Sequence, residues 1–117
     1  LAQLEASAER SGTFTRDLPG SDAFHWGEGT VRASDTRIWL EGKISPGLDY
    51  RLYLTPPLAT EEASFLKIKD QSVQVGEVKA FSNFSLDVPP GITVGDYLAV
   101  LIWCEAFGDF ITAAELN

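Results

Sequence analysis

The feature that most constrains the fold of this chain is a continuous apolar run, YLAVLIWCEAF, from Tyr97 to Phe107. Glu105 is its one charged residue, and the run contains Cys104, the single cysteine of the 117-residue chain. A run of this length, rich in aliphatic and aromatic residues and followed by Gly108, is typical of a central β-strand that is covered on both faces. Because side chains alternate along a strand, one face is predicted to carry Leu98, Val100, Ile102 and Cys104, and the other Ala99, Leu101, Trp103 and Glu105.

The rest of the chain predicts shorter strands that are separated by turns roughly every ten residues. The strands are expected over Thr13 to Arg16, His25 to Ser34, Arg37 to Lys43, Tyr50 to Leu54, Val73 to Ala80, Phe84 to Val88 and Ile111 to Leu116, the last as an edge strand. No crossover helices are available for parallel pairing. The fold class is therefore all-β, an antiparallel β-sandwich or partly open barrel of about seven to nine short strands.

Helical character is expected in two places only. Leu1 to Arg10 has apolar residues at helical spacing with Arg10 in its last turn, which predicts either a short N-terminal helix or a stalk that precedes a single β-domain over residues 11–117. Leu58 to Gln71 is polar and irregular, and is expected to be a long loop with one helical turn over Thr60 to Phe65.

Local irregularities are predicted at three glycines. Gly76 separates two valine patterns of opposite parity, which indicates a β-bulge. Gly27 and Gly29 lie within a predicted strand, where glycine indicates either a bulge or the close approach of another backbone. In the strand that begins at Tyr50, the alternation predicts that Tyr53 points outward.

Charge excludes several kinds of partner. The net charge of −8 repels phosphate groups, which argues against nucleic acid and against anionic membrane surfaces. No run of about 20 apolar residues is available to insert into a membrane. The chain begins at Leu1 and contains no methionine, so we expect that a leader or an anchor was removed upstream.

Few residues offer catalytic chemistry. The chain lacks the nucleophile elbow, the phosphate loop, the dinucleotide glycine pattern and the zinc-protease helix, so no catalytic residue is predicted. Cys104 and His25 are the one cysteine and the one histidine, so they are the only pair that could act as nucleophile and base. Three interpretations of Cys104 stay open: an inert core cysteine, a redox or ligand-contacting group, or a nucleophile.

His25 is interpreted either as a surface side chain at a strand end or as a ligand or hydrogen-bonding group at a site shared with Cys104. Soft donors are too few for zinc, and the loop carboxylates of Asp17 and Asp22 have no calcium-binding spacing, so no metal site is predicted.

Large aromatic side chains are numerous for a chain of this size. Most are expected in the core. If two or more of Trp26, Trp39 and Tyr53 share an exposed face, they form a flat platform for a polysaccharide or a partner protein.

Taken together, these segments resemble a known family, the DM-thirteen domain, often labelled "electron transfer DM". The resemblance extends from Ser11 to Leu116. It rests on Ser11-Gly12-Thr13-Phe14, on His25 followed by Gly29-Thr30-Val31, on Pro46-Gly47-Leu48-Asp49-Tyr50, on Val75-Gly76-Glu77-Val78-Lys79, and most specifically on Val100 to Phe107 with its cysteine.

The resemblance implies an all-β extracytoplasmic module, periplasmic, secreted or at the cell surface, found alone in bacteria and beside DOMON domains in animal extracellular proteins. It implies an electron-transfer or cofactor-contacting role for Cys104 first and His25 second, without naming a cofactor. The implied partner is a redox protein. The alternative, from the aromatic side chains, is a non-catalytic binding module for a glycan or a protein.

Overall fold

Eight strands form two four-stranded antiparallel sheets in the computed structural model, which describes residues 9–117. One sheet has the strand order β1-β2-β3-β6 and the other has the order β5-β4-β7-β8. The strands are β1 (Arg10–Phe14), β2 (Gly27–Ala33), β3 (Arg37–Ile44), β4 (Tyr50–Thr55), β5 (Val73–Val78), β6 (Ser85–Asp87), β7 (Ala99–Cys104) and β8 (Asp109–Glu115). The predicted all-β class is confirmed, and of its two forms the structure is the sandwich.

The apolar run becomes β7, an inner strand that pairs with β4 on one side and β8 on the other. All six of its residues are buried. Val100, Ile102 and Cys104 face the core between the two sheets, whereas Leu101 and Trp103 face a second apolar cluster on the outer side of their sheet. The predicted central strand is confirmed, and so is the division of its two faces from Val100 to Cys104; Leu98 lies before β7 and is 53% exposed.

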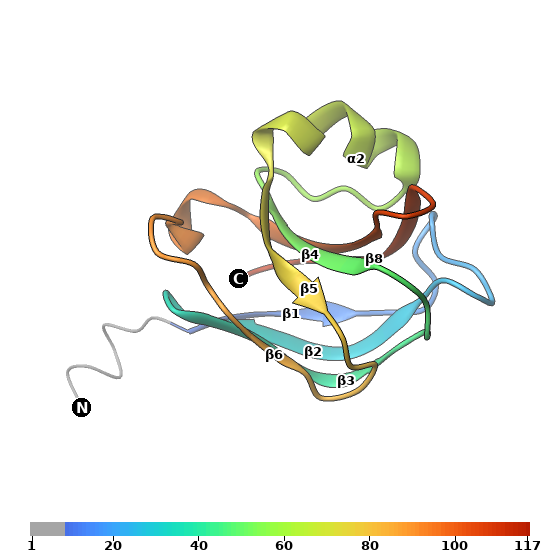
Figure 1. Cartoon of the computed structure of the whole chain (residues 1–117), viewed down its shortest axis with the longest axis horizontal. Coiled ribbons are helices and arrows are strands. Elements are labelled where there is room, and N and C mark those ends of the chain that lie inside the picture. Colours follow the sequence, from blue (N-terminus) through green and yellow to red (C-terminus); the bar gives the residue numbers. More distant parts are fainter. Residues whose placement is uncertain (1–8) are drawn as a thin grey trace.

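The second cluster exists because a helix covers the outer face of the β5-β4-β7-β8 sheet (Figure 1). Helix α2 (Glu62–Ile68) continues into the 3₁₀ turn η1 (Lys69–Gln71), and a second 3₁₀ turn, η2 (Val94–Asp96), precedes β7. Phe65 anchors α2, because its ring is fully buried with its centroid 4.7 Å from that of Trp103 and 5.2 Å from that of Tyr53. The helical turn was predicted over Thr60 to Phe65, so it begins later and runs further than predicted.

This helix also corrects the prediction for Tyr53. The side chain does point to the outer face of its sheet, but α2 covers that face and leaves Tyr53 only 6% exposed. The alternation of a strand identifies which face a side chain lies on. It does not show whether a segment distant in sequence packs on that face.

The glycine predictions resolve as one bulge and one close approach. Pairing between β4 and β5 shifts between Leu52 and Tyr53, so that Val75 is the extra residue beside Gly76. Gly29 has φ +121°, and a Cβ there would lie 2.4 Å from the carbonyl oxygen of Glu41 on β3. Gly29 therefore serves the close approach of two backbones, and the β2–β3 register continues through it without a shift.

The start of β1 lies beside the C-terminal residues at one side of the sandwich. β8 is an edge strand, as predicted, and Ser11 and Asn117 exchange two backbone hydrogen bonds. Arg10 is already the first residue of β1, so its predicted place in a helical turn is wrong; the rest of the predicted helix or stalk, before Glu9, lies outside the described residues. Within residues 9–117, no helix has the length and apolarity needed to cross a membrane.

Candidate functional site

Strand pairing brings the side chains of Tyr50, Cys104 and Asp109 into one row at an end of the sandwich. Cys104, the last residue of β7, is paired with Tyr50 at the start of β4 and with Asp109 at the start of β8. Directly paired residues of antiparallel strands point to the same face. Tyr50 and Cys104 belong to the core between the sheets, so the row lies along the inner face at its open end.

Cys104 is nearly buried, with 4% of its surface exposed, and its thiol is free. The thiol donates a hydrogen bond of 3.1 Å from Sγ to the carbonyl oxygen of Leu48. Leu48 lies in the loop before β4, where Asp49 adopts a left-handed backbone (φ 58°) and accepts a hydrogen bond from the amide of Glu105. This loop is thus attached twice to the end of β7, which fixes the orientation of the thiol.

His25 reaches the same end of the sandwich from the segment before β2. The carboxylate of Asp22 accepts hydrogen bonds of 2.8 Å from the amides of Phe24 and His25, which forms a tight turn. The same carboxylate lies 3.0 Å from Nδ1 of the His25 ring. The Phe24 amide and then the His25 side chain hold the pKa of Asp22 below its usual value.

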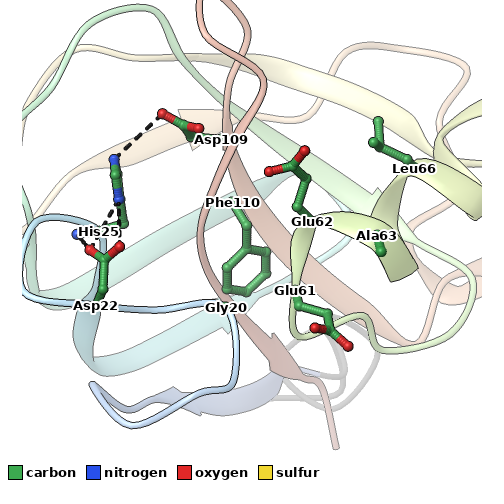
Figure 2. Close-up of a pocket in the computed structure, with 9 residues that line it drawn as sticks. All are labelled: Gly20, Asp22, His25, Glu61, Glu62, Ala63, Leu66, Asp109 and Phe110. Atoms are coloured by element: carbon green, nitrogen blue, oxygen red, sulfur yellow. Dashed lines mark hydrogen bonds and ion pairs between the residues drawn. The ribbon is translucent and has the colours of Figure 1, made fainter.

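The second ring nitrogen of His25 faces another carboxylate. Its Nε2 lies 3.5 Å from Oδ2 of Asp109, so the imidazole is placed between two acidic side chains (Figure 2). A neutral ring that donates Nδ1–H to Asp22 presents a lone pair at Nε2, and Asp109 is also an acceptor. A favourable contact between Nε2 and Asp109 therefore needs a proton, carried either by the ring itself or by a donor that lies between them.

A cavity of about 240 Å³ joins these groups. Cys104, Tyr50, His25 and Asp109 all line it. The structure thus brings the two sequence-predicted residues, Cys104 and His25, to one cavity. They are not arranged as a nucleophile and its base, because the thiol donates to a backbone carbonyl and both ring nitrogens face carboxylates.

Tyr50 contributes a neutral hydroxyl to this group. Burial raises the pKa of Tyr50, a hydrogen bond with Ser45 opposes the change, and the nearness of Cys104 and Asp109 adds to it. The cavity therefore combines a thiol, a phenol, an imidazole and a carboxylate in one lining.

The family model "Electron transfer DM13" matches residues 17–116, which is most of the chain and includes every residue of this site. The chain belongs to the DM13 family. No curated protein and no solved structure gives a match to it. The resemblance predicted from the sequence is thereby confirmed.

The three aromatic residues predicted as a platform do not lie on one surface of this DM13 domain. Tyr53 is buried beneath α2 on one sheet, whereas Trp39 lies in β3 of the other sheet and Trp26 directly precedes β2. The guanidinium of Arg16 stacks 3.5 Å from the centroid of the Trp26 ring. Trp39 pairs with Arg32 of β2, and Trp26 lies six positions before Arg32 in the sequence. Roughly 20 Å of extended chain therefore separates the two tryptophans.

A second, larger cavity of about 490 Å³ lies next to the first and shares His25 and Asp109 with it. Its lining also includes Asp22 and the residues at the start of α2, Glu61 and Glu62. Across residues 9–117, no group of three or more histidine, cysteine, aspartate or glutamate side chains is arranged to hold a metal ion. The carboxylate oxygens of Asp22 already contact the Phe24 amide in the turn and the ring of His25.

Sequence reasoning missed Tyr50 and Asp109 as site residues. Asp109 could have been found, because the turn after Cys104 predicts a hairpin that pairs the two residues. Tyr50 could not, since its pairing with Cys104 joins strands that are 54 positions apart in the sequence.

Proposed function

We propose that this DM13 domain transfers electrons through the site around Cys104, where the sulfur atom is either the redox-active group or the contact to a bound cofactor, and that the domain is not itself a catalyst. The observation that carries the proposal is the position of Cys104. Its side chain is nearly buried at the end of the inner strand β7, yet it lines a cavity that His25 and Asp109 also line.

The surroundings of the thiol suit a change of oxidation state. A thiol that loses an electron also loses its proton, and a thiol in an apolar strand has few places to send it. Here the carbonyl of Leu48 accepts the S–H, while the His25–Asp109 pair lines the same cavity and needs a proton to form a favourable contact. Reversible proton storage next to the sulfur would lower the cost of oxidising it in a low-dielectric site.

We further propose that the domain works outside the cytoplasm, as family resemblance implies, with a redox protein as its partner. A glycan is the less favoured partner, because Trp26, Trp39 and Tyr53 do not share an exposed surface.

The test uses two independent measurements on the folded domain. Dilute hydrogen peroxide converts a reactive thiol to a sulfenic acid and water, and dimedone traps the product for mass spectrometry. We expect labelling at Cys104 that dithiothreitol prevents when it is added before dimedone, and none in Cys104→Ser. In parallel, haem and flavin are titrated against both proteins and followed by absorption spectra. If Cys104 is not oxidised and neither cofactor is bound, the proposal is wrong.

A further inference from the structure

The cavity above Cys104 is surrounded by exposed apolar side chains. Phe24 is 77% exposed, Phe107 is 70% exposed and Leu48 is 69% exposed. They come from three separate loops, namely the turn before β2, the loop before β4 and the turn between β7 and β8, and all three line the cavity. We call these three residues the apolar rim. Large apolar side chains that gather around one opening indicate a contact surface.

Negative charge lies immediately beside the apolar rim. The larger cavity, which shares His25 and Asp109 with the first, adds the carboxylates of Asp22, Glu61 and Glu62. Among the described residues that line the two cavities, His25 is the one side chain able to carry positive charge, and it faces two of these acids. Glu61 and Glu62 are exposed at the start of α2 and keep their charge available to a partner.

We propose that the apolar rim with its acidic border is the docking surface for a basic redox protein whose own electron-carrying centre is apolar at its exposed edge and ringed by lysine or arginine. This proposal rests on the proposed function, because it names the partner of the same site. The apolar centre of such a partner meets Phe24, Leu48 and Phe107 above the sulfur, while its basic ring meets Asp22, Glu61 and Glu62.

The small apolar rim and its acidic border fit a brief encounter with a partner rather than a permanent complex. Electron-transfer contacts are small, commonly below about 1,200 Å² in total. Opposite charges at the border of a contact speed association and orient the partner, and salt weakens them. A small apolar centre within a charged border thus brings the two redox groups together and allows the pair to separate after transfer.

The experiment is an NMR titration of the isotope-labelled domain with a reduced basic c-type cytochrome, which serves as the probe because lysines surround its exposed haem edge. We expect saturable shifts at amides of residues 22–25, 46–49 and 105–109, with affinity falling roughly tenfold from about 20 to about 200 mM salt. The same cytochrome with acetylated lysines keeps its shape and loses its charge. We expect it to bind at least about fivefold more weakly.

Matched variants separate the two parts of the surface. Phe107→Ser should weaken binding by roughly fivefold to tenfold, and the double variant Glu61→Gln/Glu62→Gln by about threefold to tenfold. Their controls remove comparable groups at a distance: Leu98→Ser, at the opposite end of β7 and 53% exposed, and Asp87→Asn/Glu115→Gln, two exposed acids at the far ends of β6 and β8. The controls should change the affinity by less than about twofold.

The proposal is overturned if no saturable shift occurs, if the shifts map to another face, if the acetylated probe binds as well, or if the controls weaken binding as much as the site variants. Its failure is distinguishable from failure of the proposed function. Peroxide oxidation of Cys104 and cofactor uptake need no partner, so they can succeed while docking fails, and docking can succeed while Cys104 is inert.

Discussion

Tyr53 offers a sharp test of how the second apolar cluster is stabilised. Its hydroxyl donates a hydrogen bond to the Glu105 carboxylate, whose other oxygen lies 3.0 Å from Nζ of Lys69. Burial raises the pKa of Tyr53, and the hydrogen bond to Glu105 raises it further. Tyr53→Phe removes one oxygen atom from this network, keeps the ring against Phe65, and leaves the Lys69–Glu105 ion pair in place.

The expected loss in the free energy of unfolding follows from the charge of the acceptor, the Glu105 carboxylate. A hydrogen bond to a charged group contributes about 1.5–3 kcal/mol. The Glu105 side chain is 26% exposed, so water replaces part of the lost contact in the variant and the lower end applies. We therefore expect Tyr53→Phe to reduce the free energy of unfolding by about 1.5 kcal/mol, which lowers the melting temperature by roughly 6 °C in a domain of this size.

The hydrogen bond between Tyr53 and Glu105 also predicts how stability depends on pH. Burial of the Glu105 carboxyl opposes its ionisation, but hydrogen bonds from Tyr53 and Lys69 outweigh burial and hold the pKa of Glu105 below its ordinary value of 4.5. A carboxyl whose pKa is lower in the folded state contributes its full stability above the unfolded pKa and loses it as the pH falls through the folded pKa. The difference between wild type and Tyr53→Phe should therefore be constant from about pH 7 to pH 5 and shrink below about pH 4.5.

The assay is urea unfolding of both proteins between pH 3 and pH 7, followed by tryptophan fluorescence. Glu105→Gln is the matched control, because it keeps an acceptor and removes the charge. In that background we expect Tyr53→Phe to cost less than about 1 kcal/mol at every pH. An equal loss with and without the charge, or a difference that grows as the pH falls, would refute the reasoning.

Three further predictions concern the scaffold around the site. Gly29→Ala should destabilise the domain by roughly 2–4 kcal/mol in urea unfolding, because a Cβ there meets the β3 backbone and φ is +121°; a loss below about 0.5 kcal/mol would contradict the close approach. Ile102→Ala should cost about 2–5 kcal/mol, since the side chain is fully buried between the sheets, and a melting temperature within about 2 °C of wild type would contradict its central position. Asp22→Ala removes the acceptor of the turn and of the His25 ring, so amide exchange at Phe24 and His25 should accelerate by at least about tenfold; unchanged exchange would show that the turn does not depend on the carboxylate.

The sequence predicts the scaffold better than the site. The run around Val100 and Ile102 identifies the inner strand because an apolar segment of that length has to be covered on both faces, and Gly76 marks the bulge because the valine parity changes there. Helix α2 is harder, since one buried residue, Phe65, attaches an otherwise polar segment. No local pattern reveals that this segment covers Tyr53.

The site itself depends on contacts between distant segments. Cys104 and His25 are noticeable in the sequence because each is unique. The acidic partners of His25 and the apolar rim are not, since the pattern around Phe24, Leu48 and Phe107 does not show that these three side chains meet. Their exposure becomes visible only when three loops meet at one end of the sandwich. Pairing register and loop geometry supply that information, and composition does not contain it.

The most direct test of the central claim is the rate at which iodoacetamide, a small neutral reagent, alkylates Cys104 in the native domain. If the sulfur lines an accessible cavity, Cys104 should react in the folded protein at a rate that is insensitive to stabilising or destabilising variants such as Tyr53→Phe. If the sulfur were sealed in the core, alkylation would need global unfolding, would be slower by more than about 1,000-fold than in the unfolded chain, and would accelerate in each destabilised variant. That second result would contradict the account.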